Sequence, residues 1–136
     1  MNHLAIMRQP WYSMIKNRTK PKESRCSVNQ NVPYKKIVED DWIYFKLSSV
    51  HFIELKAQAG HVEFYNHNIQ DSLRKYQREI GIDEVYILSK AKARYLTLID
   101  LINITPIKAF AFIKHDQRAW ITDFKLASLD QFIQVK

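Results

Sequence analysis

The strongest constraint on the fold is a set of apolar segments with strand-like character that are not separated by helices at regular intervals. Residues 42–47 and 52–65 follow one another as two strands, and residues 95–104 form a third, rich in Leu and Ile, which Pro106 is predicted to end. The additional short strands that we expect are 3–7, 110–113, 119–122 and, more weakly, 20–27. Strands therefore outnumber helices, and a regular parallel strand-helix-strand architecture is excluded.

Helical segments interrupt this strand pattern in several places. Pro10 is placed to open a short helix that carries Trp11, Met14 and Ile15 on one face. A second helix begins at residues 68–71 and ends at Gly81, with apolar side chains on one face at Ile69, Leu73, Tyr76 and Ile80. Further helices are predicted for residues 83–90 and 127–133. The break in alternation near Gly60 predicts a β-bulge within the second strand.

The fold class that accounts for these elements is α+β, as a small mixed β-barrel, closed or nearly closed, with flanking helices. Closure removes the exposed strand edges that such apolar strands would otherwise present. A length of 136 residues fits one domain over residues 1–136. We expect residues 122–136 to be a C-terminal extension of it.

Composition excludes several classes of site. Two glycines in the whole chain rule out a glycine-rich phosphate loop, and the histidine spacing matches no metal motif, so neither a cofactor nor a metal is expected. The single cysteine, Cys26, cannot form an intramolecular disulfide, which favours a reducing compartment. No apolar run is long enough to cross a membrane and no leader is apparent, so we expect a soluble cytoplasmic protein.

The net charge of the chain is concentrated near its start. Residues 1–37 hold eight of the Lys and Arg side chains and one acid, whereas residues 38–136 hold thirteen of each sign, so the formal +7 of the protein belongs to its first quarter. The centre of this charge is residues 18–25, Arg-Thr-Lys-Pro-Lys-Glu-Ser-Arg. Such a local excess predicts a site for an anion such as a phosphate, a nucleotide or an RNA backbone.

Alternation along an extended segment divides these residues between two faces. Glu23 and Arg25 should point one way as an ion pair, whereas Lys20, Lys22 and Ser24 should point the other way. Two ammonium groups about 6 to 7 Å apart would repel each other, and an anionic ligand would relieve that repulsion. The alternative is a solvated basic face with a structural ion pair.

Aromatic side chains add a second element of the predicted site. Arg118 and Trp120 could supply a phosphate contact and a stacking plane, as in proteins that grip single-stranded RNA or a free base. Tyr12, beside Trp11 in the first helix, could line the same cleft. The alternative is that Trp120 is a core residue covered by Arg118, since tryptophan is usually largely buried.

The run Glu23-Ser-Arg-Cys-Ser27, with Asn29 and Pro33-Tyr34, resembles the N-terminal block of the ASCH (activating signal cointegrator homology) domain family. Residues 93–99 (ARYLTLI) and 114–120 (KHDQRAW) resemble later blocks, so the likeness spans about residues 3–121. The resemblance implies a PUA-like β-barrel, a fold shared with RNA-binding and modified-base-reading domains. It also places Lys20 at the catalytic lysine of members that hydrolyse acylated cytidines, and Glu23 at their threonine nucleophile.

Two functions from different classes follow from these residues. The first is a module that binds RNA or a nucleotide-like anion through Lys20, Lys22, Ser24, Arg25 and Arg118, with stacking by Trp120 or Tyr12, and whose affinity falls steeply with salt. The second is a hydrolase of a modified nucleoside or of RNA, in which Lys20 is the base or electrostatic stabiliser and Glu23 its partner. An interaction protein without a small ligand is a third alternative. The oligomeric state is left open.

Overall fold

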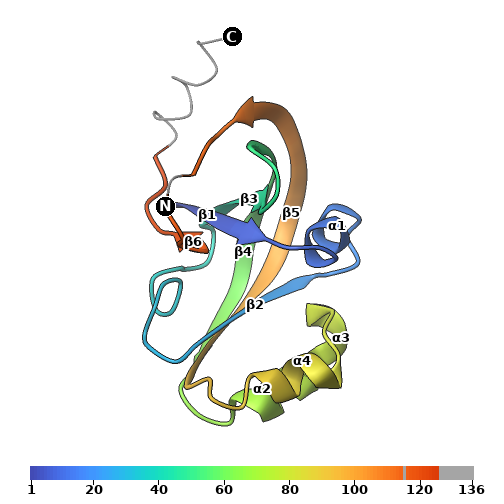
Figure 1. Cartoon of the computed structure of the whole chain (residues 1–136), viewed down its shortest axis with the longest axis vertical. Coiled ribbons are helices and arrows are strands. Elements are labelled where there is room, and N and C mark those ends of the chain that lie inside the picture. The colour runs from blue at the N-terminus through green and yellow to red at the C-terminus, as the bar shows by residue number, and fades with distance from the viewer. Residues whose placement is uncertain (115, 126–136) are drawn as a thin grey trace.

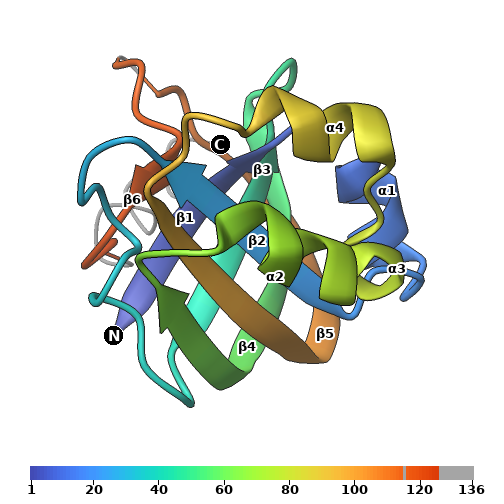
Figure 2. The same cartoon turned by 90° about the horizontal axis from the view of Figure 1, so that it is seen from below.

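The computed structural model describes residues 1–114 and 116–125 of the chain. Within them, six strands form one strongly curled sheet in the order β2-β5-β4-β3-β1-β6, open along one side as a half-barrel (Figures 1 and 2). The strands are β1 (Asn2–Met7), β2 (Lys22–Ser27), β3 (Trp42–Leu47), β4 (Phe52–Tyr65), β5 (Tyr95–Ala111) and β6 (Trp120–Ile121). The β1–β3 pair is parallel and the other pairs are antiparallel, so the sheet is mixed, as predicted.

Short helices cover the sheet at one end. They are α1 (Trp11–Lys16), α2 (Ile69–Lys75), α3 (Gln77–Ile80) and α4 (Glu84–Ser89). Figure 2 shows α1 beside α4, and α2 and α3 across β2 and β5. The α+β class and the barrel-like curvature predicted from the sequence are therefore confirmed, although the barrel is open rather than closed.

Alternation of apolar residues builds the core. Along β4, Ile53, Leu55, Ala57 and Ala59 are buried at every second position. The last three pack inside the half-barrel, whereas Ile53 packs in a second cluster of buried residues. The buried residues fall into three clusters. One lies inside the half-barrel, around Phe45 and Ile99, one is formed around Tyr44 and Phe124, and one lies between the helices and β5, around Leu73 and Leu96.

Several element boundaries agree with the sequence. The strands 42–47 and 52–65 have the predicted ends, and the β4–β5 register shifts between Ala59 and Val62, so the predicted bulge near Gly60 is confirmed. Gly81 ends α3 in the left-handed conformation, with φ 79°. Asp83 caps α4 by accepting a hydrogen bond from the backbone N–H of Tyr86.

Other boundaries differ. The helix predicted from residue 68 to Gly81 is divided at Tyr76, whose φ of −111° lies outside the helical range. Pro106 does not end the third long strand, because β5 continues to Ala111 and takes in the first two residues of the predicted strand 110–113. The proline is tolerated because β2 pairs only with Tyr95–Asp100, so β5 has a free edge at this point, next to a register shift in β4. The helix predicted for 127–133 lies outside the described residues.

Candidate nucleotide-binding cleft

The open side of the half-barrel places β2 opposite the end of β1. Arg25 of β2 reaches across this seam, donating from Nη2 to the carbonyl oxygen of Ile6 at 3.2 Å and from Nη1 to that of Ala119 at 3.4 Å. The same guanidinium lies 5.1 Å from the ring centroid of Trp120. The seam is therefore bridged by one charged side chain, and a cleft opens beside it.

Three charged side chains form the floor of this cleft. Lys20 is 1% exposed and Glu23 is 4% exposed, and the Nζ of Lys20 lies 3.2 Å from Oε1 of Glu23. On the other carboxylate oxygen, Oε2, Glu23 accepts from Nη2 of Arg25 at 2.9 Å and from its Nε at 3.1 Å. Local sequence explains part of the grouping, because Glu23 and Arg25 share one face of β2, and Lys20 in the segment before the strand reaches Glu23 with its ammonium.

Hydrogen bonds saturate two of these three groups. Besides contacting Glu23, Lys20 donates to the carbonyl oxygens of Lys22 at 2.9 Å and Ile80 at 2.5 Å, which accounts for its three N–H bonds. The carboxylate of Glu23 also accepts from the backbone N–H of Ser24 at 3.1 Å, so each of its oxygens has two partners. The floor is therefore a fixed structure with a net positive charge.

Burial and charge set the protonation of this network. Burial lowers the pKa of Lys20, and the neighbouring Glu23 carboxylate opposes that effect without cancelling it. Burial alone would raise the pKa of Glu23, but the charges of Lys20 and Arg25 outweigh it and hold the pKa below its ordinary value. The carboxylate is thus kept ionised by its two cations.

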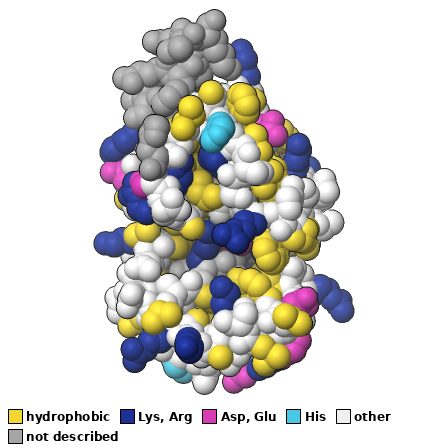
Figure 3. All heavy atoms as spheres, in the orientation of Figure 1, with side chains coloured by type: hydrophobic (Ala, Val, Ile, Leu, Met, Phe, Trp, Pro, Cys, Tyr) yellow, Lys and Arg dark blue, Asp and Glu magenta, His cyan; other side chains and the backbone are white. Residues whose placement is uncertain are grey.

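The cleft above this floor has a volume of about 240 Å³. Its walls include Trp11 of α1 and Tyr86 of α4, whose rings meet edge to face with centroids 5.6 Å apart. Trp11 is fixed by donating its indole N–H to the carbonyl oxygen of Gly81 at 2.9 Å. Arg8 and Lys90 complete the rim, and the ammonium of Lys90 lies 5.0 Å from the Tyr86 ring centroid. Figure 3 shows Lys and Arg side chains along the middle of this face, beside a recess.

Four of the predicted site residues meet in this cleft: Lys20, Glu23, Ser24 and Arg25. Lys22 does not, because its ammonium pairs with Asp100 and lies 4.6 Å from the Tyr76 ring centroid. The predicted repulsion between Lys20 and Lys22 is wrong. Each lysine has its own carboxylate partner, since the strand begins only at Lys22 and its alternation does not extend back to Lys20.

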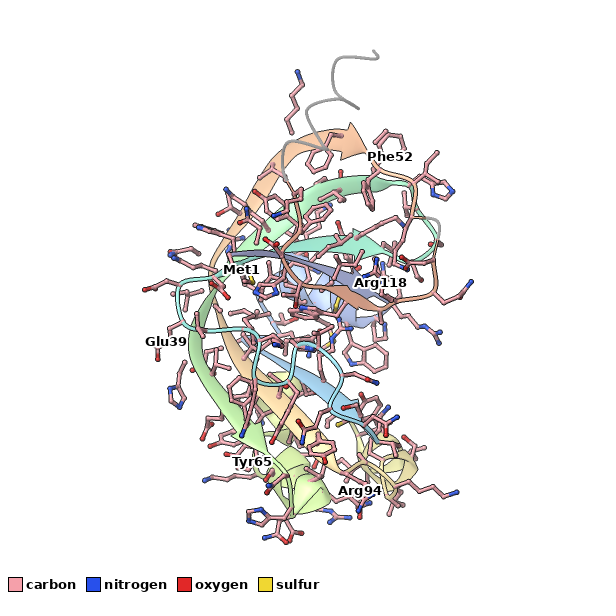
Figure 4. All side chains as sticks on the ribbon, turned by 90° about the vertical axis from the view of Figure 1, so that its left-hand side faces the viewer. Met1, Glu39, Phe52, Tyr65, Arg94 and Arg118 are labelled. Carbon is pink, nitrogen blue, oxygen red and sulfur yellow. The ribbon has the colours of Figure 1, made fainter. Side chains whose placement is uncertain are left out.

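The remaining predicted residues lie elsewhere. Tyr12 and Trp120 are buried in the core inside the half-barrel, where the indole of Trp120 donates to Nδ1 of His3 at 3.2 Å, so neither ring is open for stacking. Arg118 is on the surface with a 63% exposed side chain and pairs with Asp116 at 2.7 Å. Figure 4 shows Arg118 at the level of β1, between the two ends of the molecule.

Sequence reasoning missed four residues of the cleft: Arg8, Trp11, Tyr86 and Lys90. Arg8 directly follows β1, and its positive charge without a neighbouring acid is the one local signal that could have placed it in the site. Tyr86 and Lys90 are more than sixty residues from Glu23 in sequence, and only the packing of α4 against α1 brings them to the cleft.

Other chemistry receives no support at this site. Burial raises the pKa of the Cys26 thiol to about 11, which keeps this cleft residue protonated at neutral pH. Within residues 1–114 and 116–125, no group of three or more His, Cys, Asp or Glu side chains is placed to hold a metal ion. In the same part of the chain, no helix is both long and apolar enough to cross a membrane.

Comparison with known proteins finds similar structures but no similar sequence. No family model matches the sequence, and no curated protein matches it. The structure is similar to the ASCH protein of Zymomonas mobilis, with a TM-score of 0.73 and 12% identity over 98% of this chain and 94% of that one. A serine-to-alanine variant of that protein gives a TM-score of 0.74 with 13% identity, over 98% and 95% of the two chains.

A more distant similarity is to the N-terminal domain of McrB from Staphylothermus marinus, with a TM-score of 0.58 and 11% identity over 99% of this chain and 94% of that domain. At such low identities the likeness concerns the fold and not the ligand. The curled six-stranded sheet, its flanking helices and the match over nearly the whole chain agree with one another. The chain therefore has the fold of the ASCH structures, the family that its sequence resembles.

Proposed function

We propose that the protein is a binding module whose cleft takes one nucleotide of RNA or a free nucleotide-like anion. The cleft of about 240 Å³ is smaller than the 300 to 1,000 Å³ typical of sites for drug-sized ligands, and it suits a single base with its sugar. Its lining combines four cations with one carboxylate that is already fully hydrogen-bonded. This combination favours an anionic ligand.

The observation that carries the proposal is a set of cationic side chains around the cleft whose N–H groups are not fully used in contacts with the described residues. Arg8 is exposed, and neither Arg8 nor Lys90, whose ammonium lies against the Tyr86 ring, forms an ion pair with the described residues. Nη1 of Arg25 has the single, long contact to Ala119, so one of its N–H groups is available to a ligand. These three side chains line one cleft, so together they define where an anion would be held.

The aromatic walls support a base rather than a simple anion. The Trp11 and Tyr86 rings flank the cleft, and stacking on such rings tolerates any base. Burial, with further contributions from nearby negative groups, raises the pKa of Tyr86 to about 12, so its hydroxyl is a neutral donor at physiological pH.

The test is the salt dependence of binding to pentauridylate, measured by fluorescence anisotropy. Arg8→Gln should weaken binding at low salt and reduce the slope of log affinity against log salt by about 0.7, the value for one phosphate contact on a single strand. Lys108→Gln is the matched control, because Lys108 is an exposed cation on β5 that does not line the cleft. A flat salt response of the unmodified protein, or equal effects of the two variants, contradicts the proposal.

A hydrolase of a modified nucleoside or RNA is the second candidate. Its support is Lys20, a buried lysine at the cleft floor whose pKa is lowered by burial, as a catalytic base requires. The saturated hydrogen bonds of Lys20 and Glu23 weigh against it, since a base needs a free lone pair directed at its substrate. Turnover of N4-acetylcytidine that disappears in Lys20→Met, with the fold retained, would favour this function over simple binding.

A further inference from the structure

Lys46 of β3 is a buried cation without a carboxylate partner. It is 4% exposed, and its Nζ donates to the carbonyl oxygen of Leu47 at 3.3 Å. Among the described residues, no acid lies within ion-pair distance of it. A buried ammonium group with one acceptor leaves two N–H bonds without a partner, and such a group is costly unless an anion compensates it.

Two further cations belong to the segment that leads into β6, where the carbonyl oxygen of Ala119 accepts from the N–H of Ile6, the register partner of Lys46. Lys114 has a side chain that is mostly buried and lies 2.8 Å from Oδ1 of Asp116, and Arg118 contacts Oδ2 of the same carboxylate at 2.7 Å. Burial, and secondarily the charge of Lys114, lowers the pKa of Lys46. Lys114 and Arg118 therefore share one carboxylate, whereas Lys46 has none, so the three side chains carry a net positive charge.

This cation group lies next to the cleft. Lys46 is the register partner of Ile6 in the parallel β1–β3 pair, and the carbonyl oxygen of Ile6 accepts from Arg25 on the other side of β1. Arg118 directly precedes Ala119, which lines the cleft. Figure 3 shows Lys and Arg side chains continuing along this face, above and below the recess.

We propose that Lys46, Lys114 and Arg118 form a second anion site, which binds a backbone phosphate of a single-stranded RNA whose neighbouring nucleotide occupies the cleft. The inference rests on the proposed function and extends it from one nucleotide to a strand. A polyanion with a base and a phosphate in each repeat matches the arrangement, in which an aromatic-walled recess is followed by a separate cluster of cations. A free mononucleotide in the cleft reaches only the first of these sites.

The experiment compares two probes, uridine 5′-monophosphate and pentauridylate, on the full chain. We expect Lys46→Met and Lys114→Gln each to reduce the affinity for pentauridylate about tenfold at low salt, as expected for loss of a hydrogen-bonded charge pair. Each should also reduce the salt slope by about 0.7. Both variants should leave the affinity for the monophosphate unchanged. Lys108→Gln, which removes an exposed cation elsewhere, should change neither.

The outcomes separate this inference from the proposed function. If the unmodified protein binds both probes but neither variant weakens pentauridylate binding, the second site is wrong and the cleft stands. If a variant weakens both probes equally, the residue acts through the cleft, which also overturns the second site. If neither probe binds, the proposed function itself fails. Lys114→Gln carries the test should Lys46→Met fail to fold, because Lys114 lies outside the strands.

Discussion

The guanidinium of Arg25 donates to the carbonyl oxygen of Ile6 at 3.2 Å, across a seam where β2 and β1 form no main-chain ladder. One side chain thus joins the two edges of the half-barrel and at the same time shares the carboxylate of Glu23 with Lys20. Stability and ligand binding are coupled at this point, since the charge that would attract an anion also holds the seam together.

Replacing Arg25 by methionine should therefore destabilise the fold as well as weaken binding. Loss of the hydrogen bonds to Glu23 and Ile6 should lower the free energy of unfolding by about 2 kcal/mol, the usual scale for bonds to a charged group. Urea unfolding measures the effect. Arg8→Met, on the cleft rim but without such bonds, should leave the free energy of unfolding within about 0.5 kcal/mol of the unmodified protein. Equal stability of the two variants contradicts the role of Arg25 in the seam.

Lys20→Met should lower the free energy of unfolding strongly, although Lys20 lies in a segment rich in cations. It removes a cation that is 1% exposed and leaves the buried Glu23 with Arg25 alone, which should cost about 3 to 5 kcal/mol. Lys16→Met on α1 is the control, because the Lys16–Glu54 pair is exposed. A double-mutant cycle with Glu23→Gln tests the coupling, and additive losses would show that the two side chains do not interact.

The strands could be predicted well because their signal is local. Alternation along Ile53, Leu55 and Ala57 fixes β4 whatever its neighbours are, and the run at 95–104 identifies β5 by composition. The prediction that Pro106 ends the strand is wrong because a proline is tolerated there only since β2 ends opposite Asp100. That is a property of the sheet and not of the segment around Pro106. The break at Tyr76 likewise has no local signal in the sequence.

The site could be predicted only in part, for a related reason. Charge segregation located Lys20, Glu23 and Arg25, but alternation could not show that Lys20, which precedes the strand, lies on the Glu23 side. The aromatic walls depend on α1 meeting α4, so Tyr86 could not be assigned in place of the buried Trp120. Long-range packing decided which rings and cations share the cleft.

His3 should make the fold sensitive to mild acid. Burial lowers the pKa of His3, although Asp41 opposes this, and the ring accepts from Trp120 at Nδ1, which requires the neutral form. Because the unfolded chain binds this proton more readily, the stability contribution is present above pH about 6.5 and is lost as the pH falls towards the lower folded value. The contribution of His3 to the slope of the free energy of unfolding against pH should approach but not exceed about 1.4 kcal/mol per pH unit.

Urea unfolding at a series of pH values between about 5 and 8 measures this slope. His3→Gln should flatten it, whereas His61→Gln should not, because His61 is exposed. A slope that His3→Gln leaves unchanged would assign the acid sensitivity to another group.

Gly81 should tolerate no side chain without cost. Its φ of 79° is a left-handed conformation, so Gly81→Ala should lower the free energy of unfolding by about 1 to 2 kcal/mol. A new Cβ would also meet the end of the Met14 side chain, which is flexible enough to move. Since the carbonyl oxygen of Gly81 holds the Trp11 indole, thermal unfolding and Trp fluorescence should change together. A shift in stability without a change in fluorescence would show that Trp11 keeps its position.

Tyr86 provides the sharpest test of how the cleft grips its ligand. If a base stacks on this ring, Tyr86→Leu should weaken pentauridylate binding by about 1 to 3 kcal/mol, whereas Tyr86→Phe, which keeps the ring, should retain most of the affinity. Phe52→Leu is the control, because Phe52 is an exposed aromatic residue at the far end of β4 (Figure 4). Equal losses for Tyr86→Leu and Tyr86→Phe would assign the contribution to the hydroxyl, and so to a hydrogen bond. No loss in either variant would exclude stacking on Tyr86 and leave Trp11 and the cations of the cleft to account for the attraction.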